Sequence, residues 1–170
     1  MAVTSTTDST FNQIARKGSK LSQFVGASQK IIGDEVSTRT LLPSESGSLC
    51  LFDVAAGVTY TLPTIDRTEQ VGMYFDFAVN VVGTGTYKVI TGAATEFLVG
   101  KIVLVDKTIA TSGDVFDANG TTHVAIAATS DVTGRLLGGT FRVTAINLTQ
   151  WFIDGVLQEA GTGLDPFATS

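Results

Sequence analysis

The sequence contains few of the residues from which catalytic and metal centres are usually built. It has one cysteine, Cys50, and one histidine, His123, in 170 residues. A single cysteine cannot form an intrachain disulfide or supply the thiolates of a zinc cluster. A Ser-His-Asp arrangement would have to use His123. We expect Cys50, in the apolar segment 49–52, to be a small buried side chain. We expect His123 to be an ordinary surface or interface residue on the less apolar face of a strand.

Long apolar runs, proline and charge are also scarce. No stretch approaches 18 consecutive apolar residues, so the sequence predicts no membrane-spanning helix. Residues 1–10 are polar, and we expect no secretory signal there because the apolar core of such a signal is missing. With 3 prolines, 16% charged residues and 44% apolar residues, the composition excludes collagen, a disordered chain and a coiled coil.

β-Branched residues, in contrast, are abundant. Valine, isoleucine and threonine account for 53 positions (18, 10 and 25), and 18 glycines are available for turns. From Val36 onward, apolar residues recur with a period of two, most clearly over residues 73–79. We predict an all-β domain, an antiparallel sandwich or barrel of about ten short strands. The predicted strands are 36–42, 49–54, 58–62, 73–79, 86–91, 102–105, 115–118, 121–127, 140–146, 149–153 and 156–159.

Three glycine-containing segments predict hairpins between these strands. Asn119-Gly120 and Asp154-Gly155 are typical of type I′ turns, which need positive φ at both central residues. Gly83-Thr84-Gly85 would make a three-residue connection. We accordingly expect an N-terminal docking arm over residues 1–35, the β domain over 36–160 and a C-terminal tail over 161–170.

The first 33 residues differ from the rest in charge. They hold four basic residues against Asp8 alone, whereas the remaining residues hold 7 basic and 15 acidic groups. Because the body is acidic, we expect no direct binding to nucleic acid. Residues 10–25 have apolar residues on one helical stripe behind a Thr10/Gln13 capping pattern, so they form either a short helix or an extended arm.

The candidate chemical sites are weak. Gly83-Thr84-Gly85 and Gly161-Thr162-Gly163 do not complete a phosphate-binding loop between a strand and a helix. Oxygen atoms of Asp114, Asp117 and Asn119 have a spacing that would suit a cation, although a hairpin turn favours the same residues. The carboxylates of Asp53, Asp76 and Glu96 are candidates for a glycosidase pair. We therefore expect no catalytic residues, no cofactor and no metal, and a protein that is not an enzyme.

Trp151 and Phe152 are the strongest aromatic anchors in the sequence. They lie side by side in one predicted strand. A lone tryptophan late in a strand favours a core or oligomer contact over a sugar platform.

Several segments resemble small virion proteins of tailed bacteriophages. The run Leu41-Leu42-Pro43-Ser44-Glu45-Ser46-Gly47-Ser48-Leu49-Cys50-Leu51-Phe52-Asp53 is similar to the Ser-Gly turn and strand that open their β domain, and Val58-Thr59-Tyr60-Thr61-Leu62-Pro63 is similar to their "TLP" strand end. Gly72-Met73-Tyr74-Phe75-Asp76-Phe77, Tyr87-Lys88-Val89-Ile90-Thr91 and Trp151-Phe152-Ile153-Asp154-Gly155 extend the likeness to about residues 38–157. Members of this group usually have Thr-Asn-Trp where this chain has Thr149-Gln150-Trp151.

The resemblance implies a capsid decoration protein (a cement or head-fibre protein), commonly a homotrimer on the outside of the virion and made in the host cytoplasm. Its partner would be the major capsid protein, with no membrane involved. We expect the arm to dock on the capsid through Phe11, Ile14, Arg16, Lys17, Lys20, Leu21 and Phe24. The alternative is a receptor- or glycan-binding module of a phage fibre, with Tyr60, Tyr74, Tyr87 or Trp151 as stacking platforms.

Overall fold

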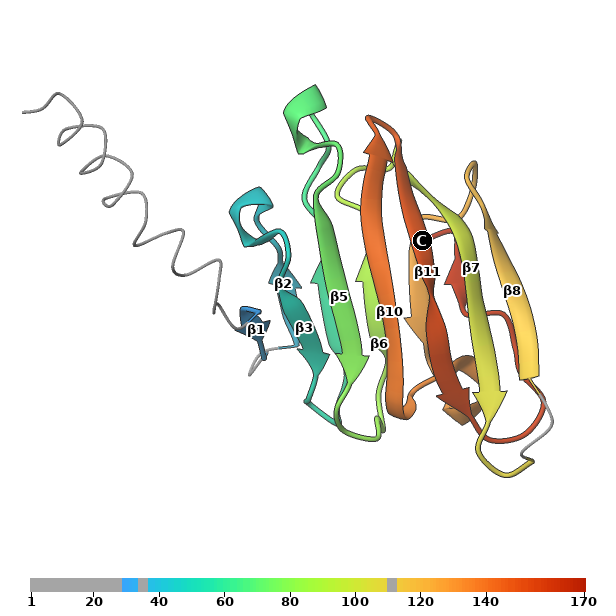
Figure 1. Cartoon of the computed structure of the whole chain (residues 1–170). Helices are drawn as coiled ribbons and strands as arrows, with labels where there is room; N and C mark the ends of the chain where they lie inside the picture. Colours follow the sequence, from blue (N-terminus) through green and yellow to red (C-terminus); the bar gives the residue numbers. More distant parts are fainter. Residues whose placement is uncertain (1–28, 34–36, 110–112) are drawn as a thin grey trace, which may run out of the picture.

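The computed structural model describes residues 29–33, 37–109 and 113–170. These residues form two β-sheets that face each other, with three 3₁₀ turns and no α-helix (Figure 1). The predicted all-β class is therefore confirmed. Neither sheet closes on itself, so the architecture is sandwich-like. The 3₁₀ turns are η1 (Pro43–Glu45), η2 (Thr68–Gln70) and η3 (Asp131–Thr133). No helix within the described ranges is long and apolar enough to cross a membrane.

The larger sheet has seven strands, and its central strands are the longest in the molecule. Its order is β1 (Ile31–Ile32), β3 (Leu49–Phe52), β5 (Tyr74–Val79), β10 (Leu136–Asn147), β11 (Gln150–Glu159), β7 (Phe97–Asp106) and β8 (Gly113–Asn119). The smaller sheet has five strands, in the order β12 (Phe167–Ala168), β9 (Ala125–Ala128), β6 (Tyr87–Ile90), β4 (Val58–Thr61) and β2 (Thr38–Thr40).

Both sheets are mixed, which corrects the prediction of an antiparallel fold. The pairs β1–β3, β3–β5, β7–β11, β2–β4 and β4–β6 are parallel. From β2 to β7, successive strands alternate between the two sheets. Because each connection crosses to the other sheet, the next strand in the same sheet runs in the same direction as the one before it.

All three predicted hairpins are wrong, two of them because of these crossings. Gly83-Thr84-Gly85 leads from β5 to β6, and Asn119-Gly120 leads from β8 towards β9; both connections join different sheets. Asp154-Gly155 is not a turn at all but lies inside β11, paired with Arg142 and Phe141 of β10. A Cβ on Gly155 would stand 2.4 Å from the Cα of Phe141. The backbones of β10 and β11 come so close at Gly155 that a side chain would not fit, which is why this position is glycine.

The core lies between the sheets and is rich in aromatic rings. Phe52 and Phe77 of the larger sheet pack against Tyr60 and Tyr87 of the smaller one, with 4.9 Å between the ring centroids of Phe52 and Tyr87. The tyrosine hydroxyls donate hydrogen bonds to backbone carbonyls, 2.8 Å from Tyr60 to Leu51 and 2.9 Å from Tyr87 to Val81. Burial of these rings therefore leaves no hydroxyl unsatisfied.

The sandwich extends beyond the predicted bounds of 36–160. β1 pairs with β3 ahead of residue 36, and β12, in the predicted C-terminal tail, pairs with β9. Residues 167–168 are thus part of the β domain of their own chain. The predicted arm helix over residues 10–25 and the predicted arm-docking residues lie outside the described residues.

Candidate functional site: the outer face of the seven-stranded sheet

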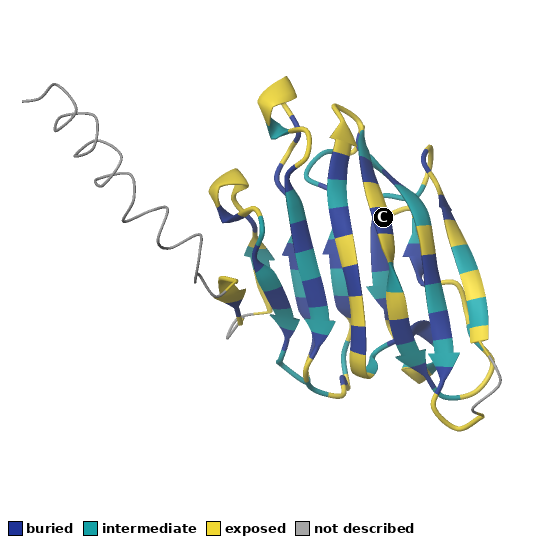
Figure 2. Cartoon of the chain, in the orientation of Figure 1, coloured by how far each residue is buried: buried dark blue, intermediate teal, exposed yellow. Residues whose placement is uncertain are grey.

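The most distinctive surface of the protein is the side of the seven-stranded sheet that points away from the five-stranded sheet, here called the outer face. Buried and exposed residues alternate along β10 and β11, so every second side chain of these strands points outward (Figure 2). This face spans the sheet from β3 to β8.

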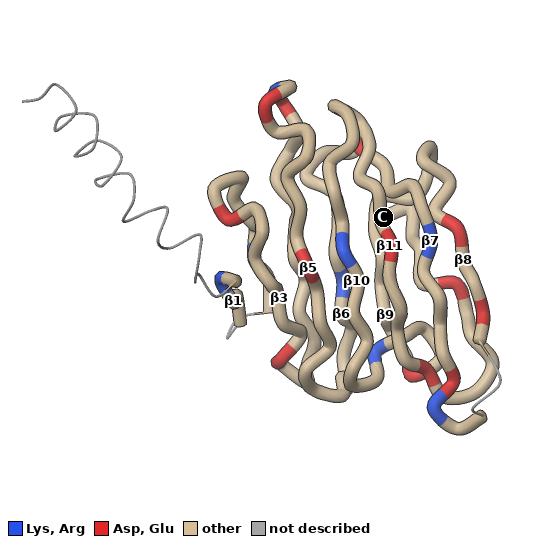
Figure 3. The backbone as a smooth tube through the Cα atoms, viewed as in Figure 1, with Lys and Arg blue, Asp and Glu red and all other residues tan. Residues whose placement is uncertain are grey.

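A row of charged residues crosses the outer face at right angles to the strands. Strand pairing places Asp76 of β5 beside Arg142 of β10, Arg142 beside Asp154 of β11, Asp154 beside Lys101 of β7, and Lys101 beside Asp117 of β8. The signs alternate at each step, and Figure 3 shows the alternation from β5 to β8. We call these five residues the charge row.

One end of the charge row is already paired within the chain. The guanidinium of Arg142 forms hydrogen bonds of 2.6 and 2.9 Å with the two carboxylate oxygens of Asp76 and lies 4.4 Å from the ring centroid of Tyr74. Gln29 donates a further hydrogen bond of 2.7 Å to Asp76. The hydrogen bonds from Arg142, with a smaller contribution from Gln29, hold the pKa of Asp76 below its ordinary value.

The other end of the charge row has no such partners. The side chains of Asp154, Lys101 and Asp117 form no ion pair or hydrogen bond with another described residue. Asp154 also borders a shallow hollow of about 470 Å³ on this face, shared with Asp76, Arg142 and the bare backbone of Gly155. Three of the five charges are therefore available to a partner.

Apolar residues flank the charge row on both sides. One flanking row runs from Ala78 through Thr140, Val156 and Val103 to Val115. The other runs from Tyr74 through Thr144, Phe152 and Val99 to Asn119. Val115 is 60% exposed, Phe152 43% and Val156 40%. Large apolar side chains gathered on one exposed face are typical of a protein-binding surface.

The structure separates the two predicted aromatic anchors. Trp151 is fully buried in the core, and its Nε1 donates a 3.0 Å hydrogen bond to Oε2 of Glu96. Phe152, the next residue, points outward on the outer face. Alternation along β11 therefore makes one a core residue and the other a surface residue.

The candidate carboxylates Asp76 and Glu96 do not form a pair. Asp76 lies on the outer face and is bound to Arg142, whereas Glu96 is buried and accepts hydrogen bonds from Trp151 and from the backbone nitrogen of Ile65. Asp53 follows β3, near Gly33. Asp76 and Glu96 therefore lie on opposite sides of the larger sheet and serve separate structural roles.

The candidate cation ligands are also separated. Asp114 and Asp117 are an odd number of residues apart on β8 and point to opposite faces, and Oδ1 of Asn119 accepts the backbone N–H groups of Thr121 and Thr122. Among the described residues, no group of three His, Cys, Asp or Glu side chains has the arrangement of a metal site.

A buried acidic cluster was not predicted. Glu159 is fully buried, and neither of its carboxylate oxygens has a hydrogen-bond partner among the described residues. A Cβ on Gly163 would stand 2.7 Å from Oε2 of Glu159 and 2.6 Å from Oδ2 of Asp114, so these two carboxylates are close together. Burial, with smaller contributions from the charges of Asp114 and Asp106, raises the pKa of Glu159.

Cys50 and His123 have structural roles. Cys50 is fully buried, as predicted, and burial is the main cause that raises the pKa of its thiol to about 12. His123 lies in the loop before β9, not in a strand; its Nδ1 accepts the backbone N–H of Asn119, and its ring stacks on Phe167. These contacts hold the β8–β9 connection and the C-terminal segment together.

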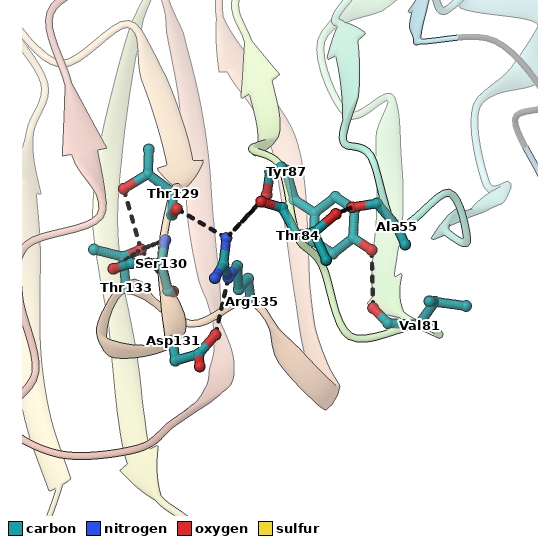
Figure 4. A network of polar contacts seen from close by, with 10 residues as sticks. Ala55, Val81, Thr84, Tyr87, Thr129, Ser130, Asp131, Thr133 and Arg135 are labelled. Atoms are coloured by element: carbon teal, nitrogen blue, oxygen red, sulfur yellow. Dashed lines mark hydrogen bonds and ion pairs between the residues drawn. The ribbon is translucent and has the colours of Figure 1, made fainter.

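Arg135 forms the other extended polar network. Its guanidinium donates to the carbonyls of Thr84 and Thr129, each at 3.2 Å, and to the carboxylate of Asp131 at 2.9 Å (Figure 4). It thereby ties the β5–β6 connection to the segment between β9 and β10. We assign this network to fold stability, because each of its acceptors is a backbone carbonyl or the neighbouring Asp131.

The charge row could not be found from sequence alone. Its members come from five strands, and neighbours such as Asp154 and Lys101 are far apart in the chain. The available signal was a charged residue at an outward position among apolar ones, as in β7 and β10. Comparison with known proteins adds nothing to this site: no protein-family model matches the chain, and no curated protein matches it.

Proposed function

We propose that the protein is a non-enzymatic structural protein of a tailed-phage virion that binds the outside of the capsid and cross-links major capsid subunits. The observation that carries the proposal is the outer face, a broad exposed surface with apolar side chains on both sides of a charge row of alternating sign. Such a surface suits contact with another protein. The resemblance of several segments to virion proteins of tailed phages is the reason for proposing a phage capsid as the partner.

The fate of the candidate catalytic groups supports a structural role. Asp76 and Glu96 both serve hydrogen bonds that hold the fold together. His123 accepts a backbone hydrogen bond and stacks on Phe167. Each of these groups therefore has a partner that holds the fold together.

In the proposed mechanism, the N-terminal arm and the β body have different partners. The arm contacts the capsid, with apolar anchors worth about 1.5–3 kcal/mol each when fully buried and basic side chains facing an acidic shell. The β body contacts a further protein through the outer face. Several copies acting together, such as the homotrimer that the resemblance implies, would gain avidity without any new contact.

The glycan-binding alternative has less support. Of its four stacking candidates, Tyr60, Tyr87 and Trp151 are buried in the core. Tyr74 is half-buried and has the guanidinium of Arg142 over its ring. None of the four candidate rings is therefore an exposed stacking platform. Phe152, which was not among the candidates, is 43% exposed on the outer face, but it is a single ring between Thr144 and Val99.

Co-sedimentation with purified undecorated heads tests the proposal. We expect the full chain to bind heads, and a variant with Arg16→Glu, Lys17→Glu and Lys20→Glu to bind at least tenfold more weakly. A truncation should stop at residue 28, because Ile31 and Ile32 form β1 and pair with β3. Full-length protein that stays in the supernatant at every head concentration would overturn the proposal.

A further inference from the structure

The outer face is self-complementary in its pattern of charge. The charge row alternates in sign with Asp154 and Lys101 at adjacent positions, and the strands that carry them, β11 and β7, are parallel neighbours. A two-fold axis that runs along the strands, midway between β11 and β7, would reverse the row on a second copy. Asp154 would then face Lys101 of the second copy, and Arg142 would face Asp117.

The flanking rows obey the same operation. About this axis, Val156 would face the second copy's Val103, and Phe152 would face its Val99. In the row of Phe152, Thr144 would face Asn119, so a polar residue meets a polar residue. In the first flanking row Thr140 would face Val115, the one pair that differs in polarity, so five of the six facing pairs match.

The other in-plane axis would bring like charges together. A two-fold axis at right angles to the strands, along the charge row, would place Asp154 opposite Asp154 and Lys101 opposite Lys101. Like charges held face to face are destabilising. Only the axis along the strands brings the three unpaired charges, Asp154, Lys101 and Asp117, against opposite ones.

The four strands β10, β11, β7 and β8 offer enough area for a small dimer interface. Four strands spaced about 4.8 Å apart and about 30 Å long cover on the order of 600 Å² of sheet, compared with about 800 Å² per partner in a standard interface. Two sheets that pack face to face with aligned strands interdigitate their side chains about 10 Å apart, as in a sandwich core. The exposed Val115, Phe152 and Val156 would supply that layer.

We propose that the outer face binds a second copy of this chain, sheet against sheet, about a two-fold axis parallel to β7 and β11. This inference rests on the proposed function only in treating the outer face as a protein-binding surface. It differs from the homotrimer that the resemblance implies, because a two-fold contact of one face with itself closes at two copies.

Charge-reversal variants in the full chain test the proposal by light scattering after gel filtration. We expect the unaltered protein to be a dimer at tens of micromolar. Asp154→Lys alone would place Lys opposite Lys101, and Lys101→Asp alone would place Asp opposite Asp154, so each variant should dimerise at least tenfold more weakly. An equimolar mixture of the two variants should form a heterodimer, because every facing pair is then opposite in sign.

The mixture separates contact between copies from effects within one chain, since neighbouring charges inside each variant are unchanged by mixing. Glu69→Lys is the matched control, because it makes the same change of charge as Asp154→Lys at an exposed position on η2. This variant should remain a dimer. A monomer at all concentrations, a trimer, or dimers of undiminished affinity in both single variants would overturn the proposal. Head binding, measured separately, decides the proposed function whichever result is obtained.

Discussion

Nε1 of Trp151 donates a hydrogen bond of 3.0 Å to Oε2 of Glu96, between two side chains that are almost completely buried. The second oxygen of Glu96 accepts the backbone N–H of Ile65 at 2.7 Å. The carboxylate of Glu96 thus accepts hydrogen bonds from two buried donors: the indole N–H of Trp151 in β11 and the backbone N–H of Ile65 after β4. Buried donors without acceptors are costly, so this relationship has measurable consequences.

We expect Glu96→Ala to lower the free energy of unfolding by about 3 kcal/mol, because both donors lose their acceptor and the side chain leaves a cavity. Glu96→Gln retains the volume and one carbonyl oxygen, so its loss should be smaller. Urea unfolding followed by tryptophan fluorescence measures both. A change below about 0.5 kcal/mol in the alanine variant would show that the pair does not stabilise the fold.

We expect substitution of Glu159 to stabilise the folded protein, by an amount that depends on pH. Its pKa is raised above 4.5 in the folded protein, so the folded state binds this proton more tightly than the unfolded chain does. The folded state is therefore penalised as the pH rises from about 4.5 through the raised value, and the full penalty applies above it. We expect Glu159→Gln to increase the free energy of unfolding by on the order of 1–3 kcal/mol at pH 8.

The same substitution should have little effect at pH 4, where the carboxyl group is protonated in both states. Glu69→Gln on the exposed η2 turn is the control and should change stability at neither pH. Chemical denaturation at the two pH values gives the comparison. An equal effect of Glu159→Gln at pH 4 and pH 8 would contradict the assignment of a buried, unpaired carboxylate.

The thiol of Cys50 should be unreactive in the folded protein. Its side chain is fully buried and its pKa is raised to about 12, so almost no thiolate is present at pH 8. We expect Ellman's reagent to label none of the folded protein over an hour and one thiol per chain in urea. Labelling of native protein at the rate of a free thiol would contradict the observed burial of β3.

Gly155 should tolerate no side chain, although it lies inside a strand. A Cβ there would stand 2.4 Å from the Cα of Phe141 and 2.5 Å from the carbonyl oxygen of Thr140. We expect Gly155→Ala to cost about 2–3 kcal/mol through this overlap. Gly72→Ala, where φ is 94° but nothing lies within 4 Å of a Cβ, should cost about 1 kcal/mol through backbone strain alone. Thermal unfolding of the two variants should therefore give the lower midpoint for Gly155→Ala, and the reverse order would refute the packing explanation.

Most strands could be predicted because alternation is a local property. The predicted segments 49–54, 58–62 and 73–79 contain β3, β4 and β5. Strand pairing could not be predicted, because a turn sequence fixes the local backbone conformation and not the sheet that the next strand joins. Asn119-Gly120 has a strong local preference for a turn, yet the strands on either side of it pair in different sheets. The same holds for the site: Asp154 and Lys101 are recognisable as charges, but not as neighbours.

The sequence by itself determined that the protein is a β protein, that Cys50 and Trp151 occupy apolar strands, and that thiolate or histidine chemistry has almost no residues to draw on. These are consequences of residue type and of a two-residue period. Only the tertiary structure decided that β11 lies between β10 and β7, and that five charges from five strands therefore form one row. Side-chain neighbours across a sheet depend on strand order and register, which are set by packing between segments distant in the chain.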